Sequence, residues 1–198
     1  MRSSGPLECR ERESCDTEAE DRQRDPRRGP GRLSVVSLGP GGRSYLIPEA
    51  LKALESSEII LGYKTYLELI ADLLEGKRVV LGRMSKEIER CETAIDFAVR
   101  GERVALVSSG DAGIYGMAGL VLDLCCRKGL HVGPSVVKSG RQVDLVMEII
   151  PGVAAFNAAA SLLGAPLMHD FAAVSLSDHL TPWELIERRL IAAASADF

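Results

Sequence analysis

Short apolar runs alternate with longer amphipathic stretches over most of the chain. The short runs are rich in β-branched residues and predict buried strands, at residues 33–38, 58–61, 79–81, 104–108 and 147–150. The longer stretches repeat apolar residues at helical spacing and predict helices, at residues 48–56, 66–74, 87–100, 117–128 and 154–163. Single helices between strands imply βαβ units, so we predict an α/β fold with a parallel, buried sheet.

The helix over residues 87–100 places Ile88, Cys91 and Ile95 on one apolar face, which we expect to pack against the sheet. Cys91 on that face is interpreted as a small buried thiol. The chain has five cysteines, but they show no C-x-x-C pair and no spacing typical of metal ligands. We therefore predict reduced cysteines and no metal site.

The two ends of the chain differ from its middle. Residues 1–32 hold eight arginines and eight acidic residues but few apolar ones, so we predict a disordered charged tail. Residues 33–152 are expected to form an N-terminal α/β domain, with a loop over residues 129–142. Residues 153–198 are expected to begin a second α/β domain, whose last helix starts after a capping Thr181. Such a unit needs a further strand, so we expect the second domain to be incomplete at residue 198.

Composition argues against several classes of function. With 198 residues, of which 46% are hydrophobic, the chain can bury a substantial core. A net charge of −4 gives no general attraction to nucleic acid or to an anionic membrane. No apolar run approaches the roughly 18 residues of a membrane span, and the acidic start does not resemble a secretion or organelle signal. We therefore expect a cytoplasmic protein that acts on a small molecule.

Three glycine-rich loops follow predicted strands, which is where ligands bind in open parallel sheets. We call residues 38–42 the first loop, residues 108–116 the second loop and residues 151–155 the third loop. Ser44 stands where a dinucleotide fingerprint needs its third glycine, which disfavours a dinucleotide-binding oxidoreductase. Asp111 in the second loop has two interpretations: an acceptor for a ligand ammonium or hydroxyl, or the N-cap of the next helix.

In this order and spacing, the three loops resemble the tetrapyrrole methylase family of S-adenosylmethionine-dependent methyltransferases. The resemblance implies two α/β domains with the methyl donor bound folded between them, and it implies a homodimer. It assigns donor contacts to residues of all three loops, namely Pro40, Ser109, Gly110, Asp111, Ile114, Ala154 and Ala155. The chain departs from the family pattern at Gly42-Arg43, where Asp-Pro is usual, and at Ala112, where proline is usual. Ala154 also replaces the usual serine or threonine and so lacks a hydroxyl for the donor.

Later segments resemble one branch of this family, which methylates C-17 of precorrin-3B and contracts the macrocycle in cobalamin biosynthesis. These segments are residues 62–66, 163–171, 175–178 and 181–184. Two alternatives stay open. One is another methylase of the family, acting at a different ring carbon or on uroporphyrinogen, and the other is an inactive remnant that serves only as a binding module. The sequence does not indicate whether the precursor carries cobalt.

Methyl transfer from a sulfonium depends mainly on alignment, because the leaving thioether needs no acid. Ring contraction needs proton movement, so the resemblance makes His169 and Asp170 the candidates for a general acid or base. A purely structural pair is the alternative interpretation. The carboxylates of the substrate require cations, and Lys64, Arg83 and Arg90 lie near predicted strand ends. For these three residues the alternative is an ordinary solvated charge.

Overall fold

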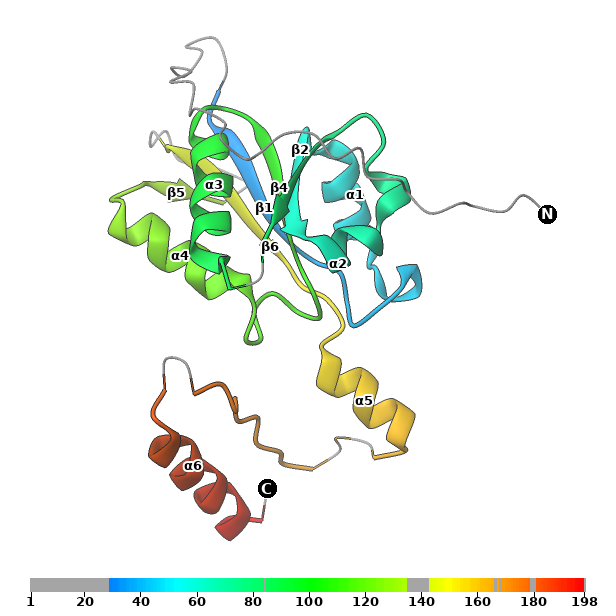
Figure 1. Cartoon of the computed structure of the whole chain (residues 1–198), viewed down its shortest axis with the longest axis vertical. Helices are drawn as coiled ribbons and strands as arrows, with labels where there is room; N and C mark the ends of the chain where they lie inside the picture. The colour runs from blue at the N-terminus through cyan, green and yellow to red at the C-terminus, as the bar shows by residue number, and fades with distance from the viewer. Residues whose placement is uncertain are drawn as a thin grey trace, which may run out of the picture.

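The computed structural model describes residues 29–83, 85–134, 143–165, 167, 169–178 and 181–197. Its centre is a six-stranded sheet, formed by β1 (Gly31–Ser37), β2 (Ile59–Tyr63), β3 (Arg78–Gly82), β4 (Arg103–Ser108), β5 (Val132–Gly133) and β6 (Leu145–Ile150). The strand order is β3-β2-β4-β1-β6-β5, and every pairing is parallel. The predicted α/β fold with a parallel sheet is therefore confirmed (Figure 1).

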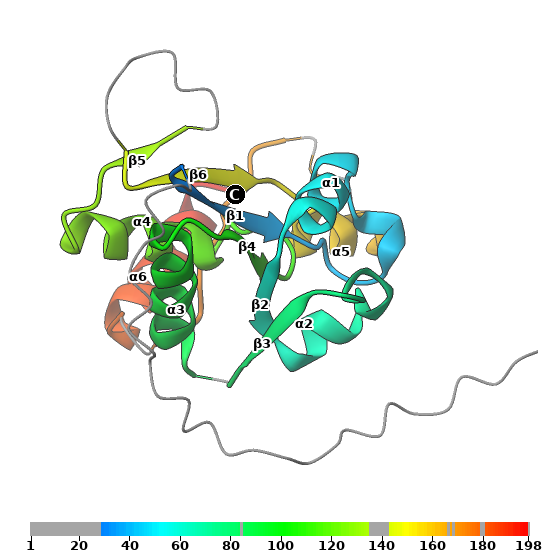
Figure 2. The same ribbon diagram turned by 90° about the horizontal axis from the view of Figure 1, so that it is seen from above.

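Four helices cover the two faces of this sheet, namely α1 (Pro48–Ser56), α2 (Lys64–Glu68), α3 (Glu87–Val99) and α4 (Met117–Arg127). Two further helices, α5 (Ala155–Leu163) and α6 (Trp183–Ser195), lie beyond one end of the sheet (Figure 1). Short 3-10 turns are η1 (Arg43–Tyr45) and η2 (Ala71–Leu73). Figure 2 shows α3 and α4 on one side of the sheet and α1 and α2 on the other. Among the residues that the structure describes, no helix is long and apolar enough to cross a membrane.

Two hydrophobic cores result, because neighbouring side chains of a strand point to opposite faces. Val35 of β1 packs in the core under α3 and α4, together with Ile95. Val36, the next residue, packs in the core under α1 and α2, together with Leu54. Each central strand thus contributes to both cores, which explains its continuous run of apolar residues.

β1 includes the last two residues of the predicted tail. Gly31 and Arg32 pair with β4 and β6, although neither residue is apolar. A Cβ on Gly31 would overlap the backbone carbonyl of Ala98, so only glycine fits this close approach. Residues 1–28 of the predicted tail lie outside the described part of the chain.

Three predicted elements need correction. The helix expected over residues 66–74 is the short α2 followed by η2, because the chain tightens into 3-10 turns that bury Leu67 and Ile70. The loop expected over residues 129–142 contains β5, which pairs with the start of β6. Thr181 does not cap α6, since the residue at the N-cap is Pro182 and it makes no side-chain hydrogen bond.

The buried face of α3 is rotated from the predicted one. Ile88 is 58% exposed, whereas Arg90 is buried. The prediction for Cys91 is confirmed, because its side chain is fully buried between α3 and the sheet. Burial raises the pKa of the Cys91 thiol to about 12, so the thiol stays protonated near neutral pH and is no nucleophile.

Candidate functional site

The three glycine-rich loops follow three adjacent strands. β1 lies between β4 and β6, and the strands end nearly level, since Ser37 pairs with Ser108 and Val36 pairs with Ile150. The carboxyl ends of these strands point toward α5 and the chain that follows it (Figure 1). The sheet therefore presents all three loops at one edge.

Backbone hydrogen bonds join the first loop to the second. The Gly39 amide donates to the Gly110 carbonyl at 3.1 Å, and the Gly110 amide donates back to the Gly39 carbonyl at 2.8 Å. Both glycines have positive φ, 73° and 62°, a conformation that other residues rarely adopt. Gly39 and Gly110 thus allow the backbones of the two loops to pair with each other.

The carboxylate of Asp111 joins the second loop to the third. Its Oδ2 accepts from the Gly152 amide at 2.9 Å, and its Oδ1 accepts from the Gly113 amide at 2.7 Å. A Cβ on Gly152 would lie 2.6 Å from both the Gly110 carbonyl oxygen and the Ser37 Cβ. The N-cap interpretation of Asp111 is wrong, because α4 begins after Gly116. Asp111 instead holds two loops in register.

Ser37, which the sequence analysis missed, anchors the second loop to β1. Its Oγ accepts a hydrogen bond from the Ala112 amide at 2.8 Å. Both residues are buried, with exposed fractions of 1% for Ser37 and 0% for Ala112. The available signal was a serine at a strand position whose alternation with Leu33 and Val35 points into a core.

Replacing Ser37 with alanine should lower the free energy of unfolding by about 1–3 kcal/mol, because the buried Ala112 amide loses its acceptor. Urea denaturation followed by circular dichroism measures this change. Ser161→Ala, at an exposed position of α5, is the matched control and should change stability by less than about 0.5 kcal/mol. An unchanged midpoint for Ser37→Ala would show that the hydrogen bond carries no net stability.

The predicted donor residues converge at this edge of the sheet. Pro40 and Ser109 are half-buried, and Ala154 is buried beneath the start of α5. Ile114 and Ala155 are exposed. The convergence of the three turns is thus present in the structure, while donor binding by the seven predicted residues stays a prediction.

The three predicted substrate cations occupy different environments. Lys64 and Arg83 are exposed and follow β2 and β3, whose ends are adjacent, since Tyr63 pairs with Gly82. Lys64 approaches Glu68 at 4.0 Å.

Arg90 differs, because its side chain is only 7% exposed. Its Nη1 donates to the Arg83 carbonyl at 3.1 Å, and its Nη2 lies 3.6 Å from a Glu87 carboxylate oxygen. The guanidinium packs directly on Gly82, where a Cβ would lie 2.5 Å from Nη1. Arg90 therefore holds the turn after β3, and only Lys64 and Arg83 are free to face a ligand.

His169 and Asp170 lie in the extended segment between α5 and α6, and both are exposed. Within the described residues, no hydrogen bond or ion pair links either side chain to the three loops. Their catalytic role stays a prediction. No group of His, Cys, Asp and Glu side chains suited to a metal ion occurs in the described part of the chain.

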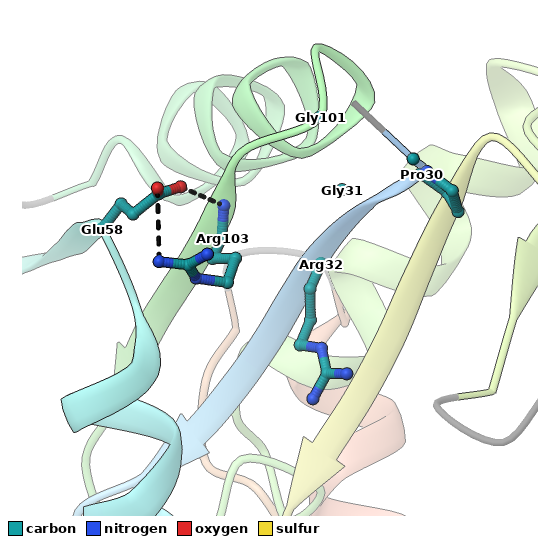
Figure 3. A pocket seen from close by; sticks show the side chains of 7 residues that line it. Pro30, Gly31, Arg32, Glu58, Gly101 and Arg103 are labelled. Carbon is teal, nitrogen blue, oxygen red and sulfur yellow. Dashed lines mark hydrogen bonds and ion pairs between the residues drawn. The ribbon is translucent and has the colours of Figure 1, made fainter. Parts of the chain in front are cut away.

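A hollow of about 380 Å³ lies at the opposite edge of the sheet, lined by the amino-terminal ends of β1 and β4 (Figure 3). Arg103 there lies 3.3 Å from Glu58, and Arg32 pairs with Glu148 at 3.1 Å. Because ligands of parallel sheets bind at the carboxyl ends of strands, and these arginines are already paired, we place the site at the loops.

Comparisons with known proteins identify the family of the chain. A model of the family described as Tetrapyrrole (Corrin/Porphyrin) Methylases matches residues 32–198. The chain is 51% identical over 166 residues to a probable cobalt-factor III C(17)-methyltransferase of Salmonella typhimurium, covering 84% of this chain and 64% of the relative. It is 40% identical over 168 residues to a precorrin-3B C(17)-methyltransferase of a Sinorhizobium species, covering 85% of this chain and 62% of the relative.

The crystal structure of the methyltransferase CobJ superimposes with a TM-score of 0.74 at 36% sequence identity. That superposition covers 85% of this chain and 65% of CobJ, so the chain spans less than two thirds of the length of these relatives. The family match extends over all three loops and over all of the described sheet except Gly31. The chain therefore belongs to the tetrapyrrole (corrin/porphyrin) methylase family.

Proposed function

We propose that the chain forms the donor-binding part of an S-adenosylmethionine-dependent methyltransferase that methylates a corrin precursor at C-17 and contracts the macrocycle. The observation that supports this most strongly is the convergence of the three loops, joined through Gly39, Gly110 and Asp111. The names of the relatives at 51% and 40% identity agree on C-17 and differ in whether the precursor carries cobalt. The proposal therefore covers precorrin-3B and its cobalt-loaded counterpart.

The start of α5 suits the carboxylate of the donor. α5 begins at Ala155 without a side-chain cap, so its first amides have no side-chain acceptor among the described residues. The partial positive charge of a helix start favours an anion there. A Cβ on Gly110 would lie 3.6 Å from the Ala155 nitrogen, so the second loop runs beside this helix start. Ile114, which is 43% exposed, offers apolar contact from the same loop.

Catalysis by these residues consists mainly of alignment. S-adenosylmethionine, when bound, supplies an electrophilic methyl group. The loops are joined by the hydrogen bonds of Ser37 and Asp111, so a bound donor would be held by a pre-organised backbone. Such fixed positioning removes much of the entropy cost of a two-molecule reaction. The proposed contribution of these loops to the rate is therefore the fixed position that they would give the donor.

The acceptor side of the site lies over β2 and β3. Lys64 and Arg83 follow these strands and are proposed to bind carboxylates of the macrocycle. His169 and Asp170, in the segment after α5, are proposed to move the proton that ring contraction requires. Because both side chains are exposed, they are open to a ligand that lies between the loops and this segment.

Isothermal titration with S-adenosylhomocysteine and a turnover assay test this function together. One protein is the chain itself, and the other is a chimaera in which the C-terminal third of the Salmonella typhimurium relative follows residue 198. We expect the chimaera to bind S-adenosylhomocysteine more tightly than the chain alone. Supplied with a ¹³C-methyl donor and cobalt-factor III, it should yield a product with one added methyl, which NMR places at C-17.

Two results would contradict the proposal. A label at another ring carbon would favour a different methylase of the family. A folded chimaera that binds neither S-adenosylhomocysteine nor substrate would favour a chain that acts only as a binding module. Equal affinity of the chain and the chimaera would show that residues 1–198 already contain the whole donor site.

A further inference from the structure

The segment over residues 169–178 has few links to the rest of the protein. It runs without helix or strand between α5 and α6, and most of its residues are exposed. Phe171 packs on Phe156 of α5, with the ring centres 5.5 Å apart. Within the described residues, one hydrogen bond joins this segment to the sheet and its loops. The Tyr115 hydroxyl donates to the Ala173 carbonyl at 2.7 Å.

Tyr115 belongs to the second loop and has an unusual backbone conformation. Its φ is 52°, in the left-handed region that bulky residues avoid. The neighbouring contacts impose this conformation, because the Ala118 amide donates to the Ala112 carbonyl at 3.0 Å and closes the loop onto α4. A Cβ on Gly116 would lie 2.6 Å from the Ala112 Cα, so the turn cannot open without losing this packing. Strained residues of this kind persist where the surrounding structure over-determines them, and they are common at functional sites.

The side chain of Tyr115 is held by its hydroxyl rather than by packing. The residue is 69% exposed, so its ring buries little surface. The position of an exposed tyrosine ring is then determined mainly by the hydrogen bond of its hydroxyl group. The left-handed backbone directs that tip out of the second loop and toward Ala173.

We propose that Tyr115 is a positioning residue that fastens residues 169–178 to the loop carrying Asp111. This inference rests on the proposed function, because that function gives the fastening a purpose. The loop proposed to hold the donor and the segment that carries His169 and Asp170 then keep fixed positions relative to each other. The hydroxyl of Tyr115 sets where the proposed proton-moving residues stand relative to the donor.

Amide ¹⁵N relaxation of the full chain without ligand tests the fastening directly, because it reports backbone order without requiring a hydrogen-bonded N–H. Tyr115→Phe removes only the hydroxyl and should lower the amide order parameters of residues 170–178 toward the flexible range, below about 0.6. The order parameters of β1 and β4 should stay near about 0.85. Tyr115→Gly relieves the left-handed strain and also removes the hydroxyl, so it should lower the order parameters of the same segment while leaving the thermal midpoint equal or higher.

Tyr66→Phe is the matched control, since Tyr66 belongs to α2 and its hydroxyl makes no hydrogen bond to a described residue. It should leave the order parameters of residues 170–178 unchanged. If Tyr115→Phe has the order parameters of the wild type in this segment, the proposal is overturned. If Tyr115→Phe lowers order parameters equally throughout the chain, the residue supports overall stability only and the proposal is again overturned.

A separate arm distinguishes this proposal from the proposed function. S-adenosylhomocysteine is added to the chimaera with and without Tyr115→Phe. Changes in the amide chemical shifts of the second loop on addition support donor binding, whichever residue stands at position 115. Lower order parameters of residues 170–178 in the ligand-free variant support the fastening even if the donor does not bind.

Discussion

Replacing Gly152 with alanine should lower the free energy of unfolding by about 3 kcal/mol and abolish measurable binding of S-adenosylhomocysteine. The added methyl would lie 2.6 Å from the Gly110 carbonyl oxygen and 2.6 Å from the Ser37 Cβ, and 3.4 Å from the Gly39 nitrogen. Two of these atoms belong to backbone that is itself hydrogen-bonded, so the clash cannot be relieved by rotating a side chain. Overpacking of this kind usually costs about 1–3 kcal/mol, and this position meets all three loops. Urea denaturation and titration calorimetry measure the two effects.

Gly119→Ala is the matched control for that substitution. Gly119 lies in α4 with nothing within 4 Å of an added Cβ, and alanine is the better helix former. This variant should be as stable as the wild type or more stable by up to about 1 kcal/mol. If Gly152→Ala unfolds at the same urea concentration as the wild type, the loops are not packed against one another as described.

Replacing Asp111 with asparagine should weaken S-adenosylhomocysteine binding at least about 10-fold and cost about 1.5–3 kcal/mol of stability. The carboxylate accepts from two backbone amides, those of Gly113 and Gly152. An asparagine side chain keeps one oxygen and turns its NH₂ group toward the other backbone N–H, so one of the two backbone amides loses its hydrogen-bond acceptor. Calorimetry on the chimaera measures the affinity, and denaturation of the chain measures the stability.

Asp123→Asn separates this effect from a general loss of charge. Asp123 lies on the outer side of α4 and pairs with Arg127 at 2.9 Å, four residues along the same helix. Exposed pairs of this kind contribute about 0.3–0.5 kcal/mol, so the control should stay close to the wild type. An Asp111→Asn variant that binds as tightly as Asp123→Asn would contradict the proposed link between the second and third loops.

The sequence was sufficient to predict the elements that local signals define. α1 has the predicted bounds, because Pro48 suits a first helical turn and apolar positions recur at helical spacing. The apolar cores of β1 and β4 were likewise found from runs of residues that are buried on both faces. The convergence of the three loops followed from two rules, that parallel strands end at one edge and that ligands bind there.

What the sequence could not supply depends on contacts between distant residues. β5 has two residues and exists only because β6 offers it a partner. Ile88 looks like a core residue by its spacing, but its side chain is exposed. Arg90, in the same first turn of α3, is buried instead, because Gly82 leaves room for its guanidinium. The roles of Ser37 and Gly152 depend likewise on which backbone lies opposite them.

The position of β1 between β4 and β6 also sets how far apart the three loops begin. Neighbouring strands lie roughly 4.8 Å apart, so the outer two loops start only about 10 Å from each other. One small molecule of ordinary size is long enough to reach all three loops at once, so a substitution in any one loop alters part of a single shared surface.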